Sequence, residues 1–159
     1  MIIFLYGKDT YRSKRKLKEI IDRYKETHKR GLNINFLDLE EESFEGFKDS
    51  VRQTSMFKEK KLVILNNILG NTDFKEKFLK EKKNFKDSDD IIIFFQEDSF
   101  NKNNALFNFL KKNSKAQEFN LLTGAKLQKW VKDYFVKYEA KINNDALILL
   151  VQRVGPNLW

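Results

Sequence analysis

Apolar and polar positions along residues 1–120 follow two alternating patterns. Short runs rich in Ile, Leu, Val and Phe predict strands that are buried in a parallel sheet. Between the runs, apolar residues recur three and four positions apart, the spacing of an amphipathic helix. The predicted strands are residues 2–6, 33–38, 62–65, 91–95 and 116–120. Five strands that alternate with helices predict an α/β three-layer domain with a five-stranded parallel sheet.

The first predicted helix, residues 11–28, places apolar residues at helical spacing among many lysines and arginines. Asp9 or Thr10 is placed to cap its first turn, and Gly31 to stop it. Later helices have inner faces formed by Phe44, Phe47 and Val51, then by Phe74, Phe78 and Leu79 before the charged residues 82–86, and then by Leu106, Phe107 and Leu110.

After Thr123 and Gly124 the strand pattern stops. Residues 127–138 and 144–154 predict two helices with more apolar surface than a hairpin buries by itself. We therefore expect an α/β domain over residues 1–123 and a partial helical domain over residues 124–159. We also expect the chain to be the N-terminal piece of a longer polypeptide.

Composition narrows the class of protein. The 159 residues include no cysteine, which excludes disulfides and thiolate metal sites. No stretch approaches the ~20 apolar residues of a membrane span, and residues 1–6 lack the basic region and cleavage site of a signal peptide. We expect a cytoplasmic protein that has no membrane partner.

The formal net charge of +8 has two interpretations. Clustered Lys and Arg side chains bind phosphate backbones and release counterions. Lysines also cover helix faces that are solvated in any case, and no aromatic residues interleave with the basic ones as in single-strand binders. We favour solvated faces, so that contact with DNA is possible but indirect.

The turn that follows the first strand lies where a phosphate-binding loop is expected. That loop requires the spacing G-x-x-x-x-G-K-[ST], which supplies a tight backbone, a cation for the phosphates and a hydroxyl for magnesium. Counted from the Gly7-Lys8 turn, the positions of the second Gly, the Lys and the hydroxyl residue hold Arg12, Ser13 and Lys14.

Strand 62–65 lies where an ATPase carries an Asp for the metal and a Glu that orients water. Asn66 and Asn67 follow this strand, and their neutral amides are poor at both tasks. The chain thus lacks both the phosphate-loop residues and the acidic residues that an ATPase needs. We therefore predict an ATPase scaffold with a degenerate nucleotide site, formed by Gly7, Lys8, Ser13, Lys14, Asn66 and Asn67. We expect no bound nucleotide, no other cofactor and no catalysis.

Other ionisable residues have structural explanations. His28 ends the first helix, where contact with the helix dipole accounts for it. The pairs Asp89-Asp90 and Glu97-Asp98 flank strand 91–95 as strand-end and helix-cap residues. Glu97 and Asp98 also lie at the carboxyl edge, where sites occur, so a metal there stays an alternative that we do not favour.

Met56 and Phe57 precede strand 62–65 and have two interpretations. Two large apolar side chains between polar Gln53 and Lys58 form an anchor with a polar rim, the pattern of a protein interface. Apolar side chains more often pack inside, however, and both could cap the domain core.

Three segments carry a family resemblance: Leu5-Tyr6-Gly7-Lys8-Asp9; Met56-Phe57-Lys58 followed by Lys61-Leu62-Val63-Ile64; and the hairpin 127–154 with Gly155 and Asn157-Leu158. In this order they resemble the delta subunits of the bacterial DNA polymerase III clamp loader, over the whole chain. The resemblance implies an AAA+-like domain without a working nucleotide site, the start of a helical lid domain, and a C-terminal collar domain outside this chain.

The resemblance also implies a binding site and partners. In that family a hydrophobic pair before the third strand enters a pocket of the ring-shaped sliding clamp, and by position the pair is Met56 and Phe57. With Gln53 and Ser55 they resemble the general clamp-binding pentapeptide, although Thr54 and Met56 both stand where Leu is usual. Because Met is an adaptable replacement, we expect modest affinity. The implied partners are the clamp and the other clamp-loader subunits, within the polymerase holoenzyme.

Two alternatives from other classes stay open. One is a nucleotide-binding enzyme with an atypical phosphate loop at Gly7 to Ser13. The other is a basic module that binds DNA through the first helix.

Overall fold

The structure is a computed structural model that describes residues 1–28, 33–52, 60–97 and 103–159. Gly31 and Asp98, named above as a helix stop and a strand-end residue, lie outside the described residues. The chain forms two compact units, Met1–Phe119 and Asn120–Trp159.

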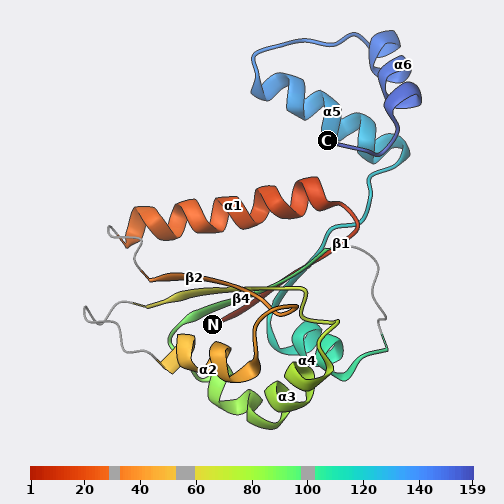
Figure 1. Ribbon diagram of the computed structural model, residues 1–159. Helices are drawn as coiled ribbons and strands as arrows, with labels where there is room; N and C mark the ends of the chain where they lie inside the picture. The colour runs from red at the N-terminus through yellow and green to blue at the C-terminus, as the bar shows by residue number, and fades with distance from the viewer. Residues whose placement is uncertain (29–32, 53–59, 98–102) are drawn as a thin grey trace. The chain divides into compact units, whose positions relative to one another are not determined.

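The first unit is built on a five-stranded parallel sheet (Figure 1), which confirms the predicted fold class. Its strands lie in the order β2-β3-β4-β1-β5. Central strands β1 and β3 are buried over nearly their whole length, whereas the edge strands β2 and β5 are partly or fully exposed. The strand bounds are β1 Ile2–Gly7, β2 Ile34–Asp38, β3 Leu62–Asn66, β4 Ile91–Glu97 and β5 Lys115–Glu118.

Helices cover both faces of this sheet (Figure 1). Helix α1 (Thr10–Thr27) lies on one face, and α2 (Phe44–Arg52), α3 (Thr72–Lys86) and α4 (Ala105–Asn113) lie on the other. Alternate residues of β1 show how the layers form, because Phe4 packs with the core of α2, α3 and α4 while Leu5 packs with Tyr24 of α1. This is the three-layer arrangement that the sequence predicted.

Helix α3 continues through the charged residues 82–86, where the sequence pattern had placed its end earlier. Phe85 explains the difference: it is 5% exposed and its ring stacks on Phe78 at 5.1 Å between centroids. Phe74, Phe78 and Phe85 share one helix face. Because burial of that face stabilises the helix, α3 continues through the lysine-rich residues to Lys86.

Each strand differs from the sequence-based prediction by one or two residues at a boundary, and the differences are largest at β4 and β5. Strand β4 runs on to Glu97, because it stays paired with β1 as far as Gly7. Strand β5 spans Lys115–Glu118 instead of residues 116–120, since Phe119 leaves the strand to contact the turn after β1.

The second unit is a pair of helices, α5 (Gly124–Lys137) and α6 (Asn144–Val154). Leu127 and Leu147 are its buried apolar residues. Asn143 caps α6, accepting a hydrogen bond from the backbone N–H of Ala146 at 2.8 Å. None of the helices in the described ranges is both long enough and apolar enough to span a membrane.

Candidate functional site

The turn between β1 and α1 is packed against the backbone of Phe119. Asp9 donates its backbone N–H to the carbonyl of Phe119 at 2.9 Å, and Phe119 donates to the carbonyl of Tyr6 at 2.8 Å. Gly7 has φ of +133°, and a Cβ at this position would lie 2.3 Å from the carbonyl oxygen of Phe119. The glycine is therefore required by this close packing of two backbones.

The N-terminus of α1 is capped by an acidic side chain. Asp9 is 2% exposed, and its Oδ1 accepts the backbone N–H of Arg12 at 3.0 Å. Its Oδ2 lies 2.6 Å from Nε of the same arginine. Helix N-termini attract phosphates through free N–H groups and the helix dipole. Here the carboxylate of Asp9 takes that position, and its charge repels a second anion.

The other predicted residues of the phosphate loop are placed differently from a nucleotide site. Lys8 is exposed to solvent. Ser13 is 1% exposed, and its hydroxyl donates to the carbonyl of Thr10 at 3.1 Å. Lys14 Nζ lies 2.9 Å from Glu97 Oε1 at the end of β4. The hydroxyl therefore points into its own helix, and the cation of Lys14 is drawn to a carboxylate.

Asn66 and Asn67 lie at the carboxyl end of β3, as predicted. Asn67 has φ of +57°, and its amide Nδ2 lies 3.2 and 3.3 Å from the two carboxylate oxygens of Asp38. The pattern of the sequence did not single out Asp38. This amide–carboxylate contact joins the ends of two neighbouring strands.

A cavity of about 380 Å³ lies at this carboxyl edge. It brings together Lys14, Asn66 and Asn67 from the predicted set, whereas Gly7, Lys8 and Ser13 do not line it. Its lining residues are Lys14, Leu17, Phe36, Ile64, Asn66, Asn67, Phe95 and Glu97. Within the described residues, no group of three His, Asp or Glu side chains is placed to hold a metal ion.

Residues at the amino edge of the sheet flank the predicted clamp-binding segment. Gln53, Ser55, Met56 and Phe57 themselves lie outside the described residues, which resume at Lys60. Tyr24 donates its hydroxyl to the carbonyl of Lys60 at 2.5 Å. Helix α2 ends at Arg52 before this segment, and β3 begins at Leu62 after it.

Lys61 is a buried lysine at this edge; it belongs to a segment that carries the family resemblance, but the sequence analysis assigned it no role. It is 7% exposed, and its Nζ donates to the carbonyls of Ser50, at 2.9 Å, and Val51. Asp90 Oδ1 accepts the backbone N–H of Lys61 at 2.9 Å. Burial lowers the pKa of the Lys61 ammonium group, and the nearby carboxylate of Asp90 partly opposes that effect. The sequence signals were its place directly before a buried strand and within a segment that carries the family resemblance.

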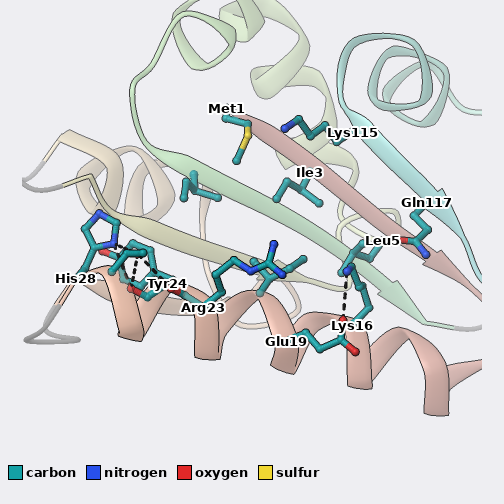
Figure 2. A pocket seen from close by; sticks show the side chains of 13 residues that line it. Met1, Ile3, Leu5, Lys16, Glu19, Arg23, Tyr24, His28, Lys115 and Gln117 are labelled. Atoms are coloured by element: carbon teal, nitrogen blue, oxygen red, sulfur yellow. Dashed lines mark hydrogen bonds and ion pairs between the residues drawn. The ribbon is translucent and has the colours of Figure 1, made fainter.

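A groove of about 450 Å³ lies between α1 and the sheet (Figure 2). Ile3, Leu5 and Ile20 are apolar lining residues, and Lys16 at its side pairs with Glu19 at 3.2 Å. His28 lies at one end, with its ring stacked on Tyr24 and Nδ1 3.1 Å from the carbonyl of Tyr24. The histidine thus contacts the last turn of its helix.

A parallel sheet in the order β2-β3-β4-β1-β5, covered by helices on both faces, defines an AAA+-like α/β protein. Comparison of sequences makes the assignment specific. The chain belongs to the family of the DNA polymerase III delta subunit, whose family model matches residues 4–120.

A solved structure shows the same fold. The chain is similar to the DNA clamp loader delta protein of Bacillus subtilis, with a TM-score of 0.65 and 20% identity. That match covers 99% of this chain and 49% of the other, so the chain spans about half the length of that protein. A DNA polymerase III gamma subunit-related protein of Thermotoga maritima matches with a TM-score of 0.49 and 12% identity, over 86% of this chain and 47% of the other. No curated protein matched the chain.

Proposed function

We propose that the chain binds a ring-shaped sliding clamp through Gln53, Ser55, Met56 and Phe57, and that it helps to open the ring without hydrolysing ATP. Membership of the delta subunit family carries this proposal, because the matched residues 4–120 include all four. Two adjacent large apolar residues between polar neighbours also have the composition of an interface centre.

The carboxyl edge of the sheet supports the part of the proposal that concerns ATP. The Asp9 carboxylate caps α1 where a phosphate would bind, and Asn67 binds Asp38 where an ATPase needs a carboxylate for its metal. Transfer of a phosphoryl group depends on such positioned charges. Energy for ring opening must then come from binding alone.

Opening by binding follows from a difference in affinity. A subunit that binds the open ring more tightly than the closed one shifts the equilibrium toward the open ring, by no more than that difference. The other subunits of a clamp loader are the further partners that this proposal requires.

Ion pairs on α1 bear on the alternative of direct DNA binding. Arg12 pairs with Asp9, Lys14 with Glu97, Lys16 with Glu19 and Lys18 with Asp22. These pairs reduce the positive charge that the helix offers to a phosphate backbone. The clamp is therefore the partner that we propose, and DNA contact stays indirect.

Replacing both Met56 and Phe57 with Ala tests the proposed site. We expect the double variant to lose about 2–4 kcal/mol of binding free energy for the cognate clamp, because buried aromatic and aliphatic anchors dominate interfaces. Isothermal titration calorimetry of each chain against the purified clamp gives the value.

Ile148 and Leu149 provide a matched control, since they are also adjacent and apolar, and are 44% and 55% exposed. Their double replacement with Ala should leave clamp affinity unchanged. If the Met56→Ala, Phe57→Ala chain binds as tightly as the original chain, the proposed site is wrong.

A further inference from the structure

Lys61 links two parts of the chain that lie on either side of residues 53–59. Its Nζ donates to the carbonyls of Ser50 and Val51 in the last turn of α2. Its backbone N–H is held by Asp90, and its carbonyl accepts the backbone N–H of Ile91 at 2.8 Å. The last turn of α2 is thereby fastened directly to the start of β3.

Burying this ammonium group has a cost that its contacts offset. A buried charge is unfavourable unless it is paired or hydrogen-bonded. The final carbonyls of a helix lack partners within the helix, and a cation there is favoured by the helix dipole. Lys61 supplies both the donors and the charge at the end of α2, and Asp90 Oδ2 lies 3.9 Å from its Nζ.

Neighbouring contacts make this attachment rigid. Tyr24 on α1 donates to the carbonyl of Lys60, and the amino group of Met1 donates to the carbonyl of Asp90 at 2.6 Å. Asp90 is thus held by Met1, directly before β1, while it holds Lys61. The start of β3 is fixed by α1 and by the end of α2, and through Asp90 by the beginning of the chain.

We propose that Lys61 is a positioning residue for clamp binding, which fixes both ends of the chain that carries Met56 and Phe57 on the folded domain. This inference rests on the proposed function. A segment with fixed ends loses less conformational freedom when it binds, so a larger fraction of molecules is competent at any moment.

This role predicts a specific kinetic signature. When the competent fraction falls, the apparent association rate falls with it. The dissociation rate depends on the contacts made in the complex, which the Lys61 side chain does not supply. Replacing Lys61 should therefore slow association, whereas replacing Met56 and Phe57 should speed dissociation.

The test compares Lys61→Met with Lys60→Met by surface plasmon resonance on the immobilised cognate clamp. Methionine has a similar length but donates no hydrogen bond. Lys60 is the exposed neighbour, and its replacement removes the same charge. We expect Lys61→Met to slow association about tenfold with dissociation changed less than about twofold. Lys60→Met should keep both rates near those of the original chain.

Each chain is also unfolded in urea, and the rates are expressed per folded molecule, so that a loss of stability alone leaves them unchanged. Lys61→Arg, which keeps a charged hydrogen-bond donor, should associate at a rate near that of the original chain. If Lys61→Met is folded and associates like the original chain, or no slower than Lys60→Met, the inference is wrong.

Two further outcomes are decided by additional chains. If Lys61→Met does not fold, Lys61→Gln is measured in its place, because the Gln amide is too short to reach both carbonyls. If neither variant folds, Lys61 is needed for folding and the inference fails. The Met56→Ala, Phe57→Ala chain is measured alongside. Absence of clamp binding by the original chain would refute the proposed function itself, whereas a defect confined to that double variant refutes only the role of Lys61.

Discussion

Gly7 and Asp9 fix the β1–α1 turn against Phe119. Gly7 permits the positive φ and the close approach of the Phe119 carbonyl, and Asp9 donates its backbone N–H to that same carbonyl. The side chain of Asp9 then caps α1. Two residues at one turn thus set both the packing and the charge at the point where a nucleotide's phosphates would lie.

Gly7→Ala should lower the free energy of unfolding by about 2 kcal/mol or more, because a positive φ strains any L side chain and its Cβ would overlap the Phe119 backbone. Urea denaturation followed by circular dichroism measures the change. Gly70→Ala is the control, since the nearest atom to its added Cβ is the Asn67 carbonyl oxygen at 3.8 Å. Equal stability of the two variants would contradict the argument.

At the scale of elements, the sheet is held to α2, α3 and α4 by a phenylalanine cluster. Phe78 on α3 is fully buried, and its ring lies 5.1 Å from those of both Phe85 and Phe94. Phe47 of α2 lies 6.2 Å from it. One side chain therefore joins two helices and a central strand, which makes α3 depend on tertiary packing more than on its lysine-rich sequence.

Phe78→Ala should destabilise the chain by about 3–5 kcal/mol, the range for removal of a buried aromatic residue that leaves a cavity. The midpoint of chemical denaturation reports the loss. Phe36→Ala removes the same side chain from a position that is 60% exposed, and should cost less than about 1 kcal/mol. A small effect of Phe78→Ala would show that this side of the core is loosely packed.

At the scale of the whole molecule, the two edges of the sheet have different properties. At the carboxyl edge, the polar side chains of Asp9, Lys14 and Asn67 contact partners within the chain. The amino edge holds residues that flank the proposed clamp-binding segment. This division separates the proposed binding function from the usual nucleotide site of the fold.

Magnesium and ATP should therefore leave the melting temperature of the chain unchanged. A ligand present at a hundred times its dissociation constant would stabilise the folded state by about 2.7 kcal/mol, which a thermal melt detects readily. Differential scanning fluorimetry with increasing Mg-ATP makes the measurement, with Mg-GTP as a parallel series. A saturable rise in melting temperature would restore the nucleotide-binding alternative.

The sequence alone determined the five strands, the helices between them and the family. Runs such as residues 91–95 predict buried strands because a strand covered on both faces needs apolar residues at every position. The cap at Asp9 was among the predicted ones because capping depends on residues only a few positions apart. These features depend on residues close together in the chain, so they can be predicted from the sequence.

Only the tertiary structure decided which polar groups meet. Asp9 binds the Phe119 backbone, Asn67 binds Asp38, and Lys61 binds the end of α2. The partners in each pair are too far apart in the sequence for the helix or strand pattern of apolar residues to predict the contact. The last turn of α3 depends in the same way on Phe85 reaching Phe78. Local patterns report what must be buried, whereas the partner of a buried polar group is set by how the elements pack.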